Sequence, residues 1–425
     1  MSQDSVRPQQ FQVKEVTIDG QDVKGIYQNI EIFENIYLSA VTGSITILDT
    51  DGGSFIEKNK IEFNEDFSFS ATGSGQDNNI KFNGVLNGLR SEYTKDSKRV
   101  YVIDFTTQEL RNNEQSFVTK KFTDESPENV IRYCLEKKLE AKDINIQGIT
   151  GKPMNFIGSR RKPFWVIKFA LTHGVVKAEA GDGKSEEKKG KELKGASGFL
   201  CWQVLSDSGQ NAYRGSELQK LVSGGQFETH TDYGNKLVNN GLSLDEQRKN
   251  IVDFNFQTMG DVQTNMKSGA MHSKVVSFDL DTGLYKEYTH KADDQMTEKQ
   301  KKIFKNPSRF LSKNYTNERF SGKCDPESPN KYDQSRDYLA QNNSSQNSFN
   351  DQSGTITLYN LYGAHAGDTI DLKMNKVKSE GDGMSHEKHS GKYLIKQVCH
   401  VFSMGGDESY TQLTLLRSSN SEQKQ

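Results

Sequence analysis

Two short stretches in the first quarter of the chain determine the fold class: Ile30-Glu31-Ile32-Phe33 and Gly43-Ser44-Ile45-Thr46-Ile47-Leu48. Apolar and polar residues alternate in them with a period of two, which is typical of strands with one buried and one wet face. Phe63–Phe69 repeats the alternation. Turn-forming residues separate these strands at 49–53 and follow the last of them at 72–75. This part of the chain therefore predicts antiparallel β-structure.

The same region continues with further strand signals at Phe82–Leu86, Leu89–Tyr93 and Val100–Phe105. The polar run Thr94–Lys98 separates the last two and predicts a turn. Five or six short strands at regular spacing over residues 26–110 predict a small β-barrel or sandwich.

Two helices are predicted after this region. Ser126 is a suitable N-cap for a helix that begins with Pro127, and apolar residues follow at helical spacing. They are Val130, Ile131, Cys134, Leu135 and Leu139. A second helix is predicted from Pro163 through Trp165 to Gly174.

The second half of the chain alternates between polar inserts and strands. Residues 178–197 are nearly all polar or charged and predict a solvated loop, and residues 290–353 are poor in apolar positions. Strand patterns occur at 199–204, 251–256, 274–280, 355–361, 368–374, 392–403 and 410–417. The predicted fold class is therefore β-rich α+β, with β-structure at both ends and mixed material between them.

Composition restricts the possible functions. The 425 residues include 55 Lys or Arg and 57 Asp or Glu, giving a net charge of −2, and 33% are hydrophobic. The near-neutral charge argues against a dedicated nucleic-acid binder, and the lack of a long apolar run argues against membrane insertion. Low hydrophobicity argues against one compact core, and the length suggests two to four domains.

The cysteines and the N-terminus suggest the compartment. Cys134, Cys201, Cys324 and Cys399 lie far apart and form no CxxC pair, which suits a reducing environment better than a disulfide scaffold or a zinc site. The first ten residues, MSQDSVRPQQ, lack the apolar core of a secretory signal. We therefore expect synthesis in a cytoplasm.

Three short motifs resemble functional sites but lack necessary parts. Gly183-Lys184-Ser185 matches the end of a P-loop, yet Ala178 stands where the first glycine is required. His386-Glu387-Lys388-His389 spaces its histidines by three rather than four, in a Gly- and Ser-rich turn. Asp49-Thr50-Asp51-Gly52 lacks the later acids of a calcium loop, and a hairpin turn explains it better.

No catalytic set emerges from the remaining residues. Cys399 and His400 are adjacent in a strand pattern, so their side chains are expected on opposite faces rather than as a nucleophile–base pair. The sequence contains no Gly-x-Ser-x-Gly motif. We therefore predict no catalytic, cofactor-binding or metal-binding residues and a protein that is not an enzyme.

The order of the segments resembles the baseplate central hub of contractile-tailed, T-even-like bacteriophages, and also the N-terminal hub region of type VI secretion spike proteins. Ile32–Asp49 resembles the opening strands of the hub's first barrel, and Tyr101–Leu110 resembles its last strand. The helices at 126–139 and 162–170 are similar to those that follow. The further matching stretches are Phe199–Gln203, Gly269–Val276, Gly391–Ser403 and Tyr410–Arg417.

The resemblance implies two tube-type antiparallel β-barrels with a mixed α/β insertion between them. The first barrel would span residues 1–112, and a mixed domain with the charged insert 178–197 would span 113–219. The second barrel would combine 220–258 with 355–418, separated by a polar insertion at 259–354. Residues 419–425 would be a flexible tail, and we expect the end of the chain, 418–425, to approach the spike.

The resemblance also implies a function. Three chains would form a ring of six similar barrels that adapts a threefold central spike to a sixfold tail tube, with a channel through which DNA passes without specific binding. Expected partners are the spike, tube or tube-initiator proteins and wedge components, and the expected location is the virion baseplate, assembled in the host cytoplasm. The alternatives are the hub of a phage-derived injection device, an envelope-degrading hydrolase and a carbohydrate-binding β-protein.

Overall fold

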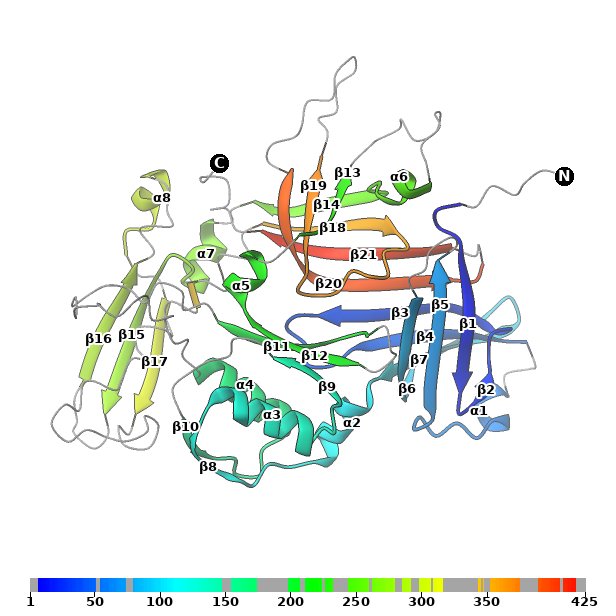
Figure 1. The fold of residues 1–425 in the computed structure, drawn as a ribbon, viewed down its shortest axis with the longest axis horizontal. Helices are drawn as coiled ribbons and strands as arrows, with labels where there is room; N and C mark the ends of the chain where they lie inside the picture. The colour runs from blue at the N-terminus through cyan, green and yellow to red at the C-terminus, as the bar shows by residue number, and fades with distance from the viewer. Residues whose placement is uncertain are drawn as a thin grey trace, which may run out of the picture.

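The computed structural model describes most of the chain (Figure 1). The described residues are 7–50, 54–73, 79–146, 154–173, 198–206, 211–223, 226–231, 244–259, 262–279, 285–291, 298–306, 309–315, 343–344, 347, 352–374, 389–405 and 408–417. Strands predominate, most of their pairings are antiparallel, and a few short helices accompany them. The predicted β-rich α+β fold class is confirmed.

The strands are β1 Phe11–Ile18, β2 Gln21–Asp22, β3 Tyr27–Asn35, β4 Thr42–Asp49, β5 Asp66–Gly73, β6 Asn79–Lys95, β7 Lys98–Thr106, β8 Lys121–Glu125, β9 Asp143–Ile146, β10 Met154–Ile157, β11 Phe199–Val204, β12 Ala212–Glu217, β13 Gln226–Thr231, β14 Asp253–Met259, β15 His272–Asp279, β16 Tyr285–Lys291, β17 Arg309–Tyr315, β18 Gln352–Tyr359, β19 Thr369–Lys373, β20 Gly391–Ser403 and β21 Glu408–Arg417. The helices are α1 Phe55–Lys58, α2 Gln108–Gln115, α3 Pro127–Lys137, α4 Pro163–His173, α5 Leu218–Ser223, α6 Leu244–Arg248, α7 Val262–Ser268 and α8 Glu298–Ile303.

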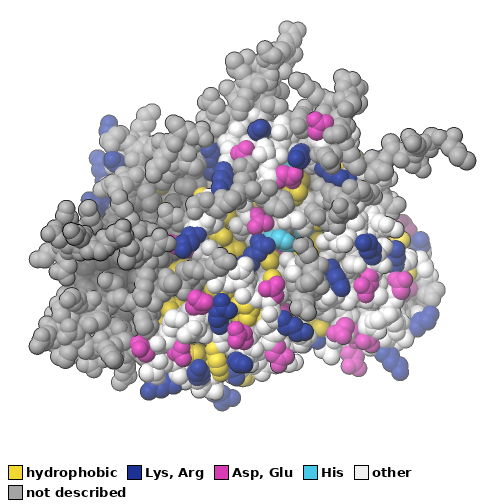
Figure 2. Space-filling view, viewed as in Figure 1, with side chains coloured by type: hydrophobic (Ala, Val, Ile, Leu, Met, Phe, Trp, Pro, Cys, Tyr) yellow, Lys and Arg dark blue, Asp and Glu magenta, His cyan; other side chains and the backbone are white. Residues whose placement is uncertain are grey.

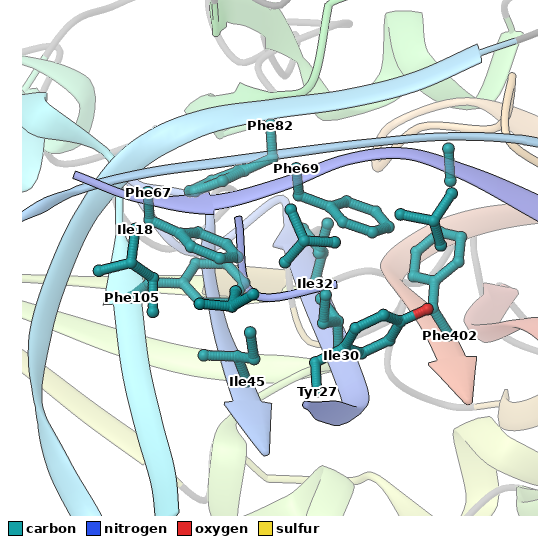
Figure 3. Close-up of a cluster of buried hydrophobic side chains, with 14 of the residues drawn as sticks. Ile18, Tyr27, Ile30, Ile32, Ile45, Phe67, Phe69, Phe82, Phe105 and Phe402 are labelled. Carbon is teal, nitrogen blue, oxygen red and sulfur yellow. The ribbon is translucent and has the colours of Figure 1, made fainter. Parts of the chain in front are cut away.

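The N-terminal strand group consists of β1 and β3–β7, paired in the order β3-β4-β7-β6-β5-β1. Its core is aromatic: the rings of Phe67 and Phe82 lie 4.4 and 4.8 Å from that of Phe105, centroid to centroid. Figure 3 shows these three rings together, with Tyr27 and Phe402 at the other side of the same cluster. The alternation of apolar and polar residues therefore directs one face of each strand into this core, as the sequence predicts.

The C-terminal strand group consists of β13, β14 and β18–β21. Pairings run in the order β14-β18-β21-β20-β19-β13. Thr231, at the end of β13, also forms a parallel bridge with Asn250, just before β14. This bridge brings the last strand of the order, β13, close to the first, β14. The second core contains Ile356, Leu358, Ile370, Leu372, Tyr393, Ile395, Val398, Leu413 and Leu415.

Strand β20 belongs to both strand groups. Its first residues, Gly391–Leu394, pair with β19, whereas Gln397–Ser403 pair with β3. Its side chains enter both cores, because Ile395 and Val398 pack in the second and Phe402 in the first. Together with β2, which pairs with β1, the two groups therefore form one continuous 13-stranded sheet.

Helices α3 and α4 and the strands around them form a mixed layer below the sheet (Figure 1). Ser126 caps α3 as predicted, because its Oγ accepts a hydrogen bond from Asn129 N at 3.1 Å. The helix ends at Lys137, so four of the five predicted stripe residues lie on α3 and Leu139 follows it; all five are buried in the core of this layer. Strand β11 is buried along its whole length and lies between this layer and the sheet.

The region between β14 and β18 contains a separate small sheet, β16-β15-β17, at one side of the molecule (Figure 1). The sequence reading found β15 but not β16, β17 or α8, because their residues carry little apolar alternation. The hydrophobic cluster beside this small sheet contains the buried residues Met271 and Phe304, and Met266 packs against them.

Several local features differ from the sequence prediction. Strand β5 begins at Asp66 rather than Phe63, because Phe63 has a φ of 61°, a conformation that no strand continues. The stretch Tyr101–Leu110 leaves the strand at Thr106, and helix α2 begins at Gln108. The reading also missed β1, which completes the first core.

Several sequence predictions fall outside the described residues. These are the insert 178–197 with Gly183–Ser185, residues 386–388 of the histidine motif, most of the turn 49–53, Cys324, much of 290–353 and the C-terminal residues 418–425. None of the helices in the described ranges has the length and apolar character needed to cross a bilayer.

Candidate functional site

A fully buried carboxylate lies where the two strand groups and strand β11 meet. Glu34, on β3, accepts hydrogen bonds from Leu205 N at 2.8 Å and Ala366 N at 3.0 Å. His365 Nδ1 lies 3.1 Å from its Oε1. Two segments far from β3 in sequence therefore converge on this side chain, and each of its oxygens has a partner, as a buried carboxylate requires.

The protonation of this cluster follows from its surroundings. Burial alone would raise the pKa of Glu34, but His365 and the hydrogen bond from Leu205 N together hold that pKa below its ordinary value. Burial also works against a charge on His365, yet Glu34 raises the pKa of His365 above its ordinary value. Glu34 and His365 thus form a mutually stabilised ion pair.

A second buried histidine lies close to this pair without sharing its charge. His400, on β20, has its Nδ1 3.1 Å from Thr411 Oγ1. Burial lowers the pKa of His400 to about 4, so the ring is neutral at physiological pH. The neighbouring Cys399 thiol has its pKa raised to about 12 by burial. Cys399 and His400 therefore carry no thiolate–imidazolium pair.

Strand β11 connects the mixed layer to both strand groups. Gln203 Oε1 accepts hydrogen bonds from Val41 N at 3.0 Å and from Thr107 Oγ1 at 2.8 Å, on the N-terminal side. Trp202 Nε1 donates to Ala366 O at 2.8 Å, on the C-terminal side. These alternating side chains bind β11 to two different neighbours, as the period of a strand requires.

The loop between β18 and β19 is built to receive the indole of Trp202. Gly367 has a φ of +94°, and a Cβ added there would lie 2.4 Å from Trp202 Cζ2. Beside it, Arg214 Nη1 on β12 lies 3.0 Å from Asp368 Oδ1. We call the set Glu34, Trp202, Gln203, His365 and Gly367 the junction.

A different feature lies at the far end of the N-terminal strand group. Strand β5 pairs with β6 only as far as Val85, whereas β7 pairs with β6 up to Lys95. Beyond Leu86, the outer edge of β6 has no partner among the described strands. Residues 90–95 are exposed on both faces, and left-handed Asp96 and Ser97 form the tight turn predicted at 94–98.

The sequence reading did not identify the junction as a site. Trp202 lies in an apolar run and Glu34 in a strand motif, and neither pattern by itself predicts a site. Glu34 was detectable, because it takes the inward position in the series Ile30, Ile32, Glu34, Ile36. A charge on the apolar face of a strand signals a buried polar partner, but His365, 331 residues away, could not be paired with it from sequence.

The polar groups of the junction face inward. Both carboxylate oxygens of Glu34 and Oε1 of Gln203 accept hydrogen bonds, whereas Gln203 Nε2 is buried without a partner. In the described ranges, no three His, Cys, Asp or Glu side chains gather so that they could hold a metal ion.

Comparison with known proteins gives the fold a context. No family profile matches the chain, and no curated protein matches its sequence. Among solved structures, the tail protein of Neisseria meningitidis MC58 superposes with a TM-score of 0.54 at 11% identity, covering 96% of this chain and 97% of that one. The 43 kDa tail protein of prophage MuSo2 from Shewanella oneidensis gives 0.56 at 8% identity, covering 96% and 98%.

A component of the Escherichia coli type VI secretion system, the c3393 protein, gives a TM-score of 0.48 at 8% identity, covering 96% of this chain and 77% of that one. The two closer superpositions extend over nearly the whole of both chains. The chain therefore has the fold of these two tail proteins, from Neisseria and from a Shewanella prophage.

Proposed function

We propose that the chain is a structural protein of a phage tail: the baseplate hub, a homotrimer that adapts a threefold central spike to a sixfold tail tube. The fold shared with two tail proteins over 96% of the chain carries this proposal. The inward-facing junction supports a structural rather than catalytic role. The location that follows is the virion baseplate, assembled in the host cytoplasm.

The two strand groups correspond in this proposal to two tube-type barrels. The first barrel would span residues 1–112, with the mixed domain at 113–219. The second would combine 220–258 with 355–418, around an insertion at 259–354, and 419–425 would be a tail. Three chains would then contribute six barrels to one ring. Support comes from the two separate aromatic and aliphatic cores and from the nearly circular strand path of the second group.

The open edge of β6 supports assembly with another chain. Unpaired strand edges are prone to pair with other strands, and natural proteins usually shield them. Here the edge extends from Asn87 to Lys95 and carries the exposed ring of Tyr93. In the proposed trimer, this edge pairs with a neighbouring chain.

The remaining proposed partners are the central spike, tube or tube-initiator proteins and wedge components. DNA would pass through the channel without specific binding. A net charge of −2 suits such a wall, because phosphate contacts from many Lys and Arg side chains would hold the DNA in place.

Light scattering after size exclusion tests the proposal. The trimer predicts three times the 47.9 kDa of the chain. Tyr93→Lys, on the open edge, should lower the fraction of trimer, whereas Tyr285→Lys, at another exposed tyrosine on β16, should not. A monomer at micromolar concentration, both alone and with the spike protein, would contradict the proposal.

A further inference from the structure

Three consecutive cationic residues, Arg160, Arg161 and Lys162, lie over two exposed aromatic rings. Lys162 Nζ is 4.4 Å and Arg160 Cζ 5.9 Å from the centre of the Phe117 ring. Arg161 Cζ lies 4.7 Å from the centre of the Trp165 ring. Phe117 and Trp165 are each 43% exposed. We call these five residues the aromatic–basic patch.

The backbone holds the patch together. Val118, next to Phe117, forms an antiparallel bridge with Arg161, and its N–H donates to Arg161 O at 2.8 Å. Phe164 N donates to Asn113 Oδ1 at 2.8 Å, which fixes the start of α4 against α2. The two aromatic rings are therefore carried by a rigid frame rather than by a free loop. Figure 2 shows that hydrophobic side chains reach the surface over the region of α3 and α4, bordered by charged ones.

The positive charge of the patch is unbalanced. The stretch 144–178 contains six Lys or Arg residues and no Asp or Glu. Glu114 lies 3.6 Å from Lys162, but Arg160 and Arg161 have no carboxylate partner among the described side chains. These cations also directly precede Pro163, where α4 begins with no acid in its first turn. Cations near a helix N-terminus are unfavourable, so their placement costs stability rather than adding it.

The indole of Trp165 is only partly accessible to a ligand. Arg161, which precedes α4, and Phe169, on α4, both lie against the indole of Trp165. Phe169 stacks on the indole with a centroid distance of 5.4 Å and an interplanar angle of 15°. Trp165 is nevertheless 43% exposed, and its N–H donates to no described residue. A carboxylate can accept from this N–H, whereas a nucleobase would have to stack on an indole that already contacts Arg161 and Phe169.

We propose that the aromatic–basic patch binds an acidic segment of another protein, with carboxylates beside Arg160 and Arg161 and an apolar side chain on Phe117. Exposed Trp and Arg are the residues that most often dominate protein interfaces. The excess of cations on the patch favours a partner segment with negative charge. The inference does not depend on the trimer, because no residue of the patch belongs to the open edge of β6.

Fluorescence anisotropy with labelled probes tests the inference. The probes are a 12-residue peptide alternating Glu with Leu, the same peptide with Gln for Glu, and a 20-nucleotide oligothymidine. The Glu peptide should bind at least about tenfold more tightly than the Gln peptide, and high salt should weaken it. Arg160→Glu/Arg161→Glu should reduce its affinity by about tenfold or more, which corresponds to about 1.4 kcal/mol.

Matched variants separate the patch from net charge and from folding. Lys142→Glu/Lys305→Glu makes the same charge change at two exposed lysines elsewhere and should change affinity less than about twofold. Trp165→Phe keeps an aromatic ring at this position but loses the indole N–H. It should therefore weaken binding while the melting temperature stays near that of the unchanged chain. Equal binding of the Glu and Gln peptides, or an equal loss in the control, would overturn the inference. Tighter binding of oligothymidine would overturn it in favour of a nucleic acid.

Discussion

Glu34 and His365 form a buried ion pair, with His365 Nδ1 3.1 Å from Glu34 Oε1, across 331 residues of sequence. One partner lies on β3 and the other in the loop between β18 and β19. The pair therefore joins the N-terminal strand group to the C-terminal one at a point closed to water. Its contribution to stability must depend on pH, because both partners titrate.

The first prediction concerns His365. Its pKa is raised above the ordinary 6.5, so its contribution is complete below that pH and is lost as the pH rises through the raised value. The pKa of Glu34 is lowered from 4.5, so the carboxylate contributes above that pH and loses its contribution only as the pH falls through the lowered value. His365→Gln should therefore lower the melting temperature more at about pH 5.5 than at about pH 8.5. An equal loss at both pH values would show that the imidazole does not carry a charge in the junction.

The second prediction concerns His400 and has the opposite sign. Burial lowers the pKa of His400 to about 4, so the unfolded chain binds a proton that the folded chain does not over the range from about 4 to 6.5. Acidification should therefore destabilise the unchanged chain relative to His400→Leu, by about 1–2 kcal/mol between about pH 7.5 and 5. Parallel melting curves of the two proteins over this range would contradict a buried, neutral His400.

The third prediction uses two glycines with similar backbone angles. Gly367 has a φ of +94° and a Cβ there would lie 2.4 Å from Trp202 Cζ2, whereas Gly20 has a φ of +75° and open space around it. Gly20→Ala should cost about 1 kcal/mol from the left-handed conformation alone. Gly367→Ala should cost about 2–4 kcal/mol, since it also forces Trp202 to move. Thermal melting gives both values, and similar losses at the two sites would mean that the contact with Trp202 is unimportant.

The fourth prediction concerns the contacts of Gln203. Gln203→Ala leaves the buried Val41 N–H without its acceptor and should destabilise the chain by about 1–3 kcal/mol. Thr107→Val removes one neutral hydrogen bond to the same oxygen and should cost about 1 kcal/mol. Because both act on Gln203 Oε1, the double variant should lose less than the sum of the two. Full additivity in urea unfolding would show that the two contacts are independent.

Strands and capped helices were predictable where the pattern was local. The alternation of Ile30 and Ile32, the cap at Ser126 and the turn at Asp96 and Ser97 each depend on neighbours in sequence, and each lies where it was expected. Strands β16 and β17 were missed, because the hydrophobic cluster beside their sheet is small and leaves little apolar signal. Phe63 shows another limit: its positive φ keeps it out of the strand, which begins only at Asp66.

The junction was beyond sequence reasoning for a different reason. Gln203 looks like an ordinary strand residue, and the partners of both Gln203 and Glu34 are set by how β3, β11 and the 360–368 loop pack together. Pairings across more than a hundred residues depend on topology, which periodicity does not encode. An acid on an apolar strand face is the one local signal that pointed toward this site.

The sharing of β20 has a mechanical consequence. A strand of 13 residues is a strut of about 40 Å that stretches very little, and here its two halves are bonded into different cores. Separating those cores would mean sliding or peeling β20 away from its neighbours in one strand group rather than bending a linker. Load applied to one half of the protein is therefore carried by covalent backbone into the other half.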